Sequence, residues 1–439
     1  MQKRFERDIK SLPKKNRKEL EDFYQTRFEN TRDKLYNGHF LFQDSINQYF
    51  DQILLKILAA NPKARRTRDV RLFLSRYYWP NASCLGEGTL IMNIGLLRRL
   101  ENESQVAFIL AHELAHLILD HVDTAVHKRV AKLNSSQARK VIRDMKKERY
   151  NANQQADEFF KDVVFDHREH SRNHESEADS LAIILLEGTV YDLNQGIRVL
   201  EILDEIDKEK YPEIKLKENF NSPDYPFRSR WMMKETGLSM AKSDDFAWDS
   251  DSLKTHPDCQ DRIVRLKRII PANYESGQLN VQTNMAFESL VRIADFEMVA
   301  STYEIGNYGR ALYYCLQLLE KYPDNAWLRA TVGISFFDIY VAQENHELRD
   351  YVDLPSKKYK EDYRGLMQFI QNLRLKEIAN ISYFYMKNNK TSFETDEHYL
   401  YGLMLTADIN GEKDEVKKYK RRYLADFPKG KYRKHVREF

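Results

Sequence analysis

Cysteine is scarce in this sequence. Cys84, Cys259 and Cys315 are its three cysteines, and they lie far apart without a CxxC pair. A disulfide-stapled domain needs several closely spaced cysteines, and a cysteine-ligated zinc site usually contains a close pair. The sequence therefore predicts neither a disulfide framework nor a cysteine-based metal site.

Long apolar runs and a surplus of one charge are also lacking. No stretch approaches about 18 consecutive apolar residues, so no integral membrane segment is expected. The formal net charge is +3, with 70 Lys and Arg against 67 Asp and Glu. Basic stretches at 62–71 and 429–439 suggest nucleic-acid binding, but the charge is offset elsewhere and no recognition motif accompanies them. We therefore expect no nucleic-acid partner.

The first 20 residues are charged throughout and lack the apolar core of a signal peptide. Two explanations stay open. The protein is cytoplasmic, or the chain begins after a signal that has been removed. Over residues 1–35 the apolar side chains recur at loose helical spacing, which predicts an amphipathic helix packed on the body of the protein.

The length of 439 residues is enough for about two to three domains. Residues 43–60 have helical periodicity, whereas 70–78 and 89–93 are rich in the aromatic and β-branched residues typical of strands. Residues 81–88 resemble a turn. A small β-sheet among helices is therefore expected in the first half.

The last third contains two matching segments, 305–323 and 410–428. Four pairs of positions, each 105 residues apart, carry the match: Gly306 with Gly411, Ala311 with Val416, Tyr314 with Tyr419, and Pro323 with Pro428. That spacing is close to three periods of about 34–35 residues, typical of tetratricopeptide repeats. We predict a degenerate array of helical repeats with a concave face for a protein partner, and an ordinary helical domain is the alternative.

The stretch FILAHELAHLILDH, residues 108–121, combines apolar residues with two histidines. Asn102 and Gln105 resemble a capping box, so a helix is expected to begin there. It is apolar almost all round, which predicts burial. His112 and His116 are four residues apart and therefore project from the same helical face.

Two histidines on one face are a common start of a zinc site, and Glu113 suits a general base acting on a water molecule at the metal. Buried polar groups cost several kcal/mol unless they are partnered, and a metal supplies that partner. Satisfied core histidines are the alternative. The motif predicts a hydrolytic centre with one zinc ion per chain.

A catalytic zinc needs a third protein ligand. Glu175 and Asp179 are four residues apart and share a helical face. Glu175 is the expected ligand, and Asp179 is expected to accept a hydrogen bond from a zinc-bound histidine.

Five further histidines are weighed against this assignment. The rival ligands His167, His170 and His174 stand among Arg, Ser and Asn, as on an exposed face. His121 and His127 are expected at the surface or behind the ligands.

Four motifs together resemble a known family: HELAHLILDH, the later ESEAD, THP followed by Arg262 and Ile263, and the upstream NASCLGEGTLIMNIGLL. They resemble the zinc metallopeptidase family of CAAX prenyl endopeptidase, HtpX and BepA, over about residues 40–270. With the repeats at the C-terminus, the chain is most similar to the soluble BepA-like members.

The resemblance implies His112, His116 and Glu175 as zinc ligands, Glu113 as catalytic base and Asp179 as the group that supports a ligand. It also implies that residues 89–93 form the sheet edge along which an extended peptide lies.

Two roles rest on the resemblance and on later residues. His256 would face the active site and stabilise the oxyanion, and Arg262 would buttress its loop. A sharper hypothesis is that His256 swings onto the open zinc position and holds the enzyme latent.

Three departures from the family pattern stand out. Gly86-Glu87-Gly88 replaces the usual Pro-Gly-Gly turn. A strongly charged insertion separates His116 from Glu175. The membrane helices of the prenyl endopeptidase and HtpX branches are missing, which argues against lipidated substrates embedded in a bilayer.

Together these features predict a mainly α-helical protein with a small β-sheet. An N-terminal helical segment (1–35) would precede a zincin-like metallopeptidase domain (36–270), a linker (271–289) and a tetratricopeptide-like domain (290–439). We expect a zinc endopeptidase acting on protein or peptide substrates, recruited directly or through a partner by the repeats. The alternative is a proteolytically silent or latent scaffold. The resemblance favours protein quality control in the bacterial periplasm or cell envelope, with the cytoplasm as alternative.

Overall fold

The computed structural model describes residues 2–65, 69–136, 172–205, 211, 213–233, 259–282, 285–357 and 359–439. The chain divides into two compact units. Unit 1 comprises Met1–Ile206 and Ala247–Ala294, and unit 2 comprises Asp207–Phe246 and Asp295–Phe439. The described parts are mainly helical with one small mixed sheet, as the sequence predicted.

Unit 1 contains a four-stranded sheet in the order β1-β2-β4-β3. Its strands are β1 (Phe40–Leu41), β2 (Arg71–Ser75), β3 (Ala82–Cys84) and β4 (Thr89–Asn93). β2 and β4 are parallel, and β1 and β3 pair antiparallel to them. The predictions of strands at 70–78 and 89–93 are confirmed.

The prediction that residues 89–93 form the sheet edge is wrong. β3, which the sequence assigned to a turn, pairs with β4 and takes the edge position. The turn between them has Gly86 and Gly88 at φ values of 84° and 96°, and a Cβ at Gly88 would lie 2.5 Å from the carbonyl oxygen of Asp69. The strand went unrecognised because three residues, Ala-Ser-Cys, are too few to show a period.

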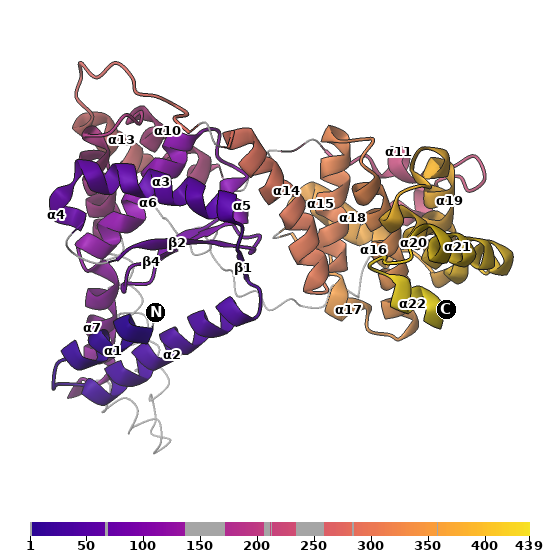
Figure 1. Cartoon of the computed structure of the whole chain (residues 1–439), viewed down its shortest axis with the longest axis horizontal. Coiled ribbons are helices and arrows are strands. Elements are labelled where there is room, and N and C mark those ends of the chain that lie inside the picture. The colour runs from indigo at the N-terminus through magenta and orange to yellow at the C-terminus, as the bar shows by residue number, and fades with distance from the viewer. Residues whose placement is uncertain are drawn as a thin grey trace. The chain divides into compact units, whose positions relative to one another are not determined.

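Four helices lie on one side of this sheet (Figure 1). They are α3 (Asp44–Ala60), α6 (Glu103–Ile118), α10 (Asn194–Asp204) and α13 (Cys259–Ile269). α3 contacts β2 and α6, α6 contacts β3 and β4, and α10 contacts both α6 and α13. Two single-turn helices, α4 (Pro62–Arg65) and α5 (Ile94–Leu97), flank the strands.

The N-terminal segment forms two helices instead of the single predicted one. α1 (Gln2–Ser11) ends just before Pro13, and α2 (Arg17–Tyr36) begins after Asn16. Proline disfavours a helical conformation for the residue before it, which explains the break. Leu12, Leu20 and Tyr24 form a small separate core with Val126 of α7 (His121–Leu133).

Residues 278–282, within the predicted linker, lie against the N-terminus of α6. The buried carboxylate of Glu103 accepts hydrogen bonds from the Tyr191 hydroxyl (2.9 Å) and from the backbone amides of Val281 (3.2 Å) and Gln282 (3.0 Å). A carboxylate in the first turn is also favoured by the helix dipole. These contacts tie the chain that leaves α13 back to α6.

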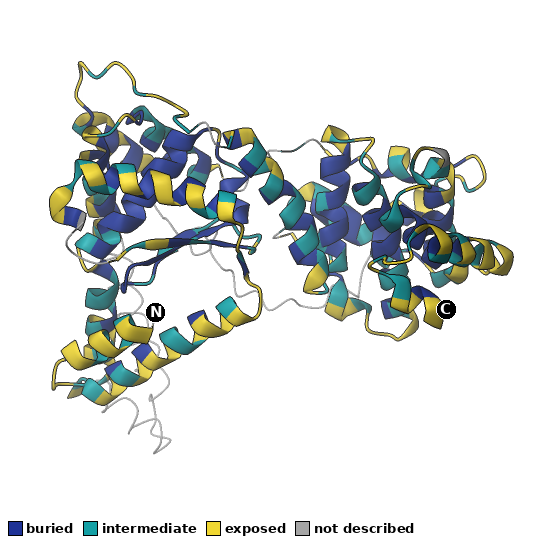
Figure 2. Cartoon of the chain, in the orientation of Figure 1, coloured by how far each residue is buried: buried dark blue, intermediate teal, exposed yellow. Residues whose placement is uncertain are grey.

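Unit 2 is a helical body with its own apolar core, shown in dark blue in Figure 2. Its longer helices are α15 (Tyr308–Lys321), α16 (Ala326–Glu344), α18 (Glu361–Gln371), α19 (Leu375–Phe393), α20 (Glu397–Ile409) and α21 (Lys413–Asp426). α14 (Phe287–Glu304) enters the unit at Asp295, and α17 (Leu348–Tyr351) and α22 (Arg433–Glu438) are short.

Part of the predicted peptidase domain belongs to unit 2. Residues 213–233 carry α11 (Leu216–Phe220) and a 3-10 turn (Ser229–Met232), and their side chains enter the helical core. Trp231 is fully buried, and its indole nitrogen donates to Glu377 (2.9 Å). The chain therefore passes through unit 2 between α10 and α13 of unit 1.

The matched repeat segments have the same local structure. Gly306 and Gly411 have φ values of 80° and 82° and precede α15 and α21. The turn after α16 is similar, with His346 at a φ of 62°. α16 packs against α15, α19 and α20, and α20 packs against α21.

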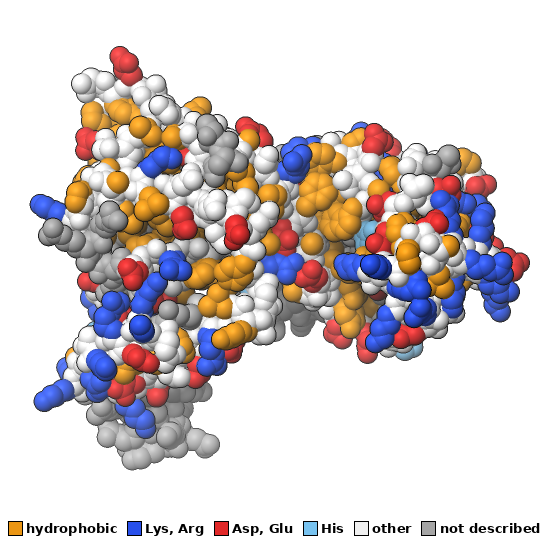
Figure 3. Space-filling model, viewed as in Figure 1, with side chains coloured by type: hydrophobic (Ala, Val, Ile, Leu, Met, Phe, Trp, Pro, Cys, Tyr) orange, Lys and Arg blue, Asp and Glu red, His pale blue; other side chains and the backbone are white. Residues whose placement is uncertain are grey.

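Basic side chains gather at one end of unit 2, over α21 and α22 (Figure 3). Several of them are paired with acids: Arg422 contacts Glu394 (3.1 Å) and Asp426 (3.2 Å), and Lys417 contacts Asp414 (3.7 Å). The basic character of this end is thus partly compensated.

Candidate metal centre and active site

α6 carries the two histidines and is almost completely buried. The Asn102 side chain accepts a hydrogen bond from the Gln105 amide (3.1 Å), so the predicted cap is present. The Gln105 side chain accepts from the amide of Glu101 (2.8 Å), one residue before the position in a regular capping box. This N-terminus fixes the start of the helix, and therefore the rotational setting of His112 and His116.

A second helix, residues 172–187, brings Glu175 and Asp179 to the same place. Nε2 of His112 lies 3.1 Å from Nε2 of His116. One carboxylate oxygen of Glu175 lies 3.5 Å from Nε2 of His112, and the other lies 3.4 Å from Nε2 of His116. The structure thus brings together the three residues that the sequence proposed as ligands.

These separations, 3.1 Å between the histidine nitrogens and 3.4–3.5 Å to the carboxylate oxygens, are close to those around a tetrahedral zinc ion. Nitrogen and oxygen ligands about 2.0–2.2 Å from a tetrahedral centre stand roughly 3.3–3.5 Å apart. Two imidazole nitrogens and one carboxylate match the donor set of many hydrolytic zinc sites, which leave a position open for substrate. The residues therefore fit a catalytic zinc ion.

The surroundings favour a positive charge at this point. Burial alone would lower the pKa of His112, but hydrogen bonds and charge from Asp179 and Glu175 raise it to about 10. Burial also opposes ionisation of Asp179, yet the Arg262 guanidinium and His112 lower the pKa of that carboxyl to about 2. The carboxylates of Glu175 and Asp179 thus supply negative charge beside the two imidazoles.

Arg262 orders the acidic side of the site. Its guanidinium donates twice to Asp179, at 2.6 and 2.7 Å, and lies 3.0 Å from Glu175. Asp179 in turn lies 3.0 Å from Nδ1 of His112, the ring nitrogen turned away from the ligand cluster. The predicted contact of Arg262 with the loop of His256 lies outside the described residues, because His256 does.

Glu113 is buried on α6, which packs against the edge strand β3. Burial raises the pKa of Cys84 on β3 to about 12, and the charge of Glu113 contributes to that rise. The carboxylate therefore lies within electrostatic range of Cys84 on the edge strand.

The remaining histidines fall into three groups. His167 and His170 lie outside the described residues. His174 stacks on His121, with ring centroids 4.1 Å apart, and does not join the three-ligand cluster. His127 lies on α7, partly exposed.

Sequence reasoning missed one residue near the ligands. Glu177 lies 3.0 Å from His121, whose other ring nitrogen lies 3.0 Å from His116. The pattern Glu175-Ser-Glu177-Ala-Asp179 was a usable signal, since a third acid stands between the two that were chosen.

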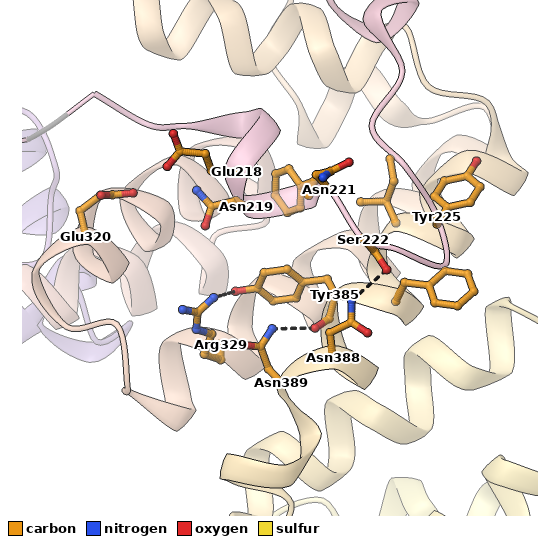
Figure 4. Close-up of a pocket in the computed structure, with 13 residues that line it drawn as sticks. Glu218, Asn219, Asn221, Ser222, Tyr225, Glu320, Arg329, Tyr385, Asn388 and Asn389 are labelled. Atoms are coloured by element: carbon orange, nitrogen blue, oxygen red, sulfur yellow. Dashed lines mark hydrogen bonds between the residues drawn. The ribbon is translucent and has the colours of Figure 1, made fainter.

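Unit 2 contains a separate polar hollow of about 270 Å³ (Figure 4). Its side chains bond to one another: Arg329 donates to the Tyr385 hydroxyl (3.2 Å), and Asn388 donates to Ser222 (2.9 Å). Asn389 donates to the Tyr385 carbonyl (2.9 Å). These bonds join the segment around Ser222 to α19 and join α19 to α16, and we interpret the hollow as a structural junction.

An HExxH helix whose histidines meet a glutamate from a second helix, beside a small sheet, is the arrangement of a zinc metallopeptidase. Residues 46–270, just over half of the chain, match Peptidase family M48. The chain belongs to this family of zinc metalloproteases. A search of curated proteins found no match to the chain. None of the helices in the described residues combines the length and apolarity needed to cross a membrane.

Proposed function

We propose that this protein is a zinc-dependent endopeptidase that hydrolyses peptide bonds of protein substrates. His112, His116 and Glu175 hold the metal, and Glu113 is the general base. The observation that carries the proposal is the meeting of three ligand atoms from two helices within 4.8 Å of one another. Glu113 follows directly after one of these ligands.

When bound, the zinc ion supplies Lewis acidity, which polarises a peptide carbonyl and makes a water molecule more acidic. Glu113 accepts the proton of the attacking water and returns it to the leaving amine. Asp179, held by Arg262, accepts a hydrogen bond from the Nδ1–H of His112 and so keeps Nε2 available as a ligand.

The edge strand β3 is the place for the substrate backbone. β3 lies next to α6, and β4 already has neighbours on both sides. An extended peptide adds to a free sheet edge through main-chain hydrogen bonds. A peptide along β3 would therefore pass beside α6, the helix that carries Glu113.

The helical unit recruits the substrate or a partner that delivers it, as in the repeat-bearing BepA-like branch. Two helix pairs support a tetratricopeptide-like array: α16 with α19, and α20 with α21. In such arrays each first helix packs on its partner and on the next first helix, the pattern of α16 with α19 and α20. On this interpretation α17 and α18 are an insertion.

Metal analysis tests the proposed site. Zinc content is measured by mass spectrometry for the wild type and for Glu175→Ala, before and after reconstitution. We expect about one zinc per chain in the wild type, and much less in the variant because one of three ligands is lost. If the wild type takes up no zinc, the proposed peptidase activity is contradicted. The alternative, a protein that acts through its helical unit, would then be favoured.

The two hypotheses about His256 are separated by one variant. If this side chain holds the enzyme latent, His256→Ala raises the rate of proteolysis. If it stabilises the oxyanion, the same change lowers the rate, with a loss of about 100-fold or more expected for one such donor.

A further inference from the structure

We propose that His121 is a positioning residue for the ligand His116: it accepts a hydrogen bond from His116 and is itself oriented by Glu177. This inference rests on the proposed zinc site. It assigns a role to a histidine just beyond the HExxH motif and to an acid between the two that the motif analysis chose.

The distances define a chain of three side chains. Nδ1 of His121 lies 3.0 Å from Nδ1 of His116, and Nε2 of His121 lies 3.0 Å from Oε2 of Glu177. The opposite nitrogen of His116, Nε2, faces the ligand cluster. His116 thus has one ring nitrogen for the metal and the other for His121.

The proton positions follow from these contacts. A nitrogen that binds a metal must offer its lone pair, so neutral His116 carries its proton on Nδ1 and donates it. Nδ1 of His121 must then accept, which leaves the His121 proton on Nε2. That proton points at the carboxylate of Glu177, a good acceptor. Only this arrangement of neutral rings satisfies both contacts.

The arrangement parallels the support of His112. Nδ1 of His112 lies 3.0 Å from Asp179, which Arg262 holds in a paired contact. His116 has no carboxylate in that place among its described contacts and meets His121 instead. Each ligand histidine therefore has its own acceptor, and the helix 172–187 supplies an acid to each chain of contacts.

The backbone and a ring stack fix the orientation of His121. Asp120 adopts a left-handed conformation, with a φ of 52°, where α6 ends, and His121 begins α7. The ring of His121 stacks on that of His174 at an interplanar angle of 9°. His121 is 5% exposed, whereas the Glu177 side chain is 60% exposed. The imidazole is thus held firmly, and Glu177 contributes less.

Two variants distinguish the hydrogen-bond acceptor of His121 from the stacking of its ring on His174. His121→Phe keeps a ring to stack on His174 but removes the acceptor. His121→Asn places a side-chain oxygen near the position of Nδ1 and keeps it. Zinc affinity is measured by competition with a chelator. We expect a loss of about 10–100-fold for the phenylalanine variant, the usual effect of losing such a partner, and recovery of most of that loss for asparagine.

Nitrogen-15 NMR of the metal-free wild type gives a second readout. It should show a hydrogen bond between Nδ1 of His116 and Nδ1 of His121, and His121→Phe should remove it. Unchanged zinc affinity in the phenylalanine variant overturns the proposal, as does equal loss in both variants. Failure of the wild type to bind zinc would count against the proposed function. The NMR measurement would still decide whether the hydrogen bond exists.

Discussion

At the scale of single residues, the largest predicted effect on the rate of proteolysis is that of replacing Glu113. Replacing it by Gln keeps the shape of the side chain but removes the proton acceptor. We expect proteolysis to fall by about 10²–10⁴-fold, the usual contribution of a general base, with zinc content unchanged because Glu113 is not in the ligand cluster. Peptide cleavage and metal analysis on the same sample check both statements. Retained cleavage would remove Glu113 from the mechanism.

Two partly buried groups in unit 2 predict a pH dependence with opposing signs. Burial, reinforced by Lys431, lowers the pKa of His398 from 6.5 to about 4. The folded state holds His398 in its neutral form. The contribution of this group to the free energy of unfolding is therefore complete above about pH 6.5 and is lost as the pH falls towards 4. Burial raises the pKa of Asp338 from 3.8 to about 6, against a hydrogen bond from Tyr303. That contribution is complete below about pH 4 and is lost as the pH rises towards 6.

These two effects nearly cancel in the wild type, so we expect its unit 2 to change little in stability between pH 4 and 6. His398→Gln should become less stable as the pH rises through this window, and Asp338→Asn more stable. Between pH 4 and 6 the free energy of unfolding of each variant should change by roughly 2–3 kcal/mol, since one pKa unit corresponds to about 1.4 kcal/mol. Hydrogen exchange in α20 reports the unfolding of this unit. Slopes of the same sign in both variants would contradict the assignment.

At the scale of elements, the contact between α10 and α6 determines where the histidines lie. Gly196 on α10 packs directly on Phe108, and a Cβ at this glycine would come within 2.6 Å of the phenyl ring. Gly196→Ala should therefore destabilise unit 1 by about 1–3 kcal/mol. Gly365 on α18 is the matched control, because a Cβ there meets nothing within 4 Å.

Gly365→Ala should stabilise unit 2 by about 0.5–1 kcal/mol, the ordinary gain of alanine over glycine inside a helix. Calorimetry of both variants provides the comparison. Equal small effects would mean that α10 can move away from α6 without cost.

The sheet shows where local patterns stop being informative. The strands at Arg71–Ser75 and Thr89–Asn93 were predictable from aromatic and branched residues. The neighbour order was not, because it depends on the hairpin that places β3 beside β4. A single helix was predicted for the N-terminal segment because apolar spacing continues across Pro13, although the backbone does not.

At the scale of the whole molecule, the chain passes from unit 1 into unit 2, returns to unit 1 at Ala247, and enters unit 2 again at Asp295. Trp231 lies within residues matched to the peptidase family, but it is buried in the core of unit 2. Trp231→Ala should destabilise unit 2 by about 3–5 kcal/mol, because it removes a large buried side chain and leaves Glu377 without that donor. The zinc content of unit 1 should stay the same.

Met233→Ala is the matched control for this prediction. Met233 lies two residues further along the same segment and is 67% exposed, so its loss should change stability by less than about 0.5 kcal/mol. Thermal unfolding and metal analysis of both variants decide the matter. If Trp231→Ala leaves unit 2 unchanged, the segment 213–233 is not part of its core.

The sequence by itself determined the chemistry of the candidate site. Helical spacing puts His112 and His116 on one face and Glu175 and Asp179 on another, because 3.6 residues make a turn wherever the helix lies. The burial of α6 also followed from its composition. These properties are local, so a short stretch of residues is enough to specify them.

Only the tertiary structure decided which of these groups meet. It aligned Glu175 with the histidines, gave Asp179 to Arg262 and His112, brought His121 between His116 and Glu177, and placed residues 213–233 in the second unit. Such contacts join residues far apart in the chain. They depend on how helices and strands pack as a whole, and no local pattern encodes that packing.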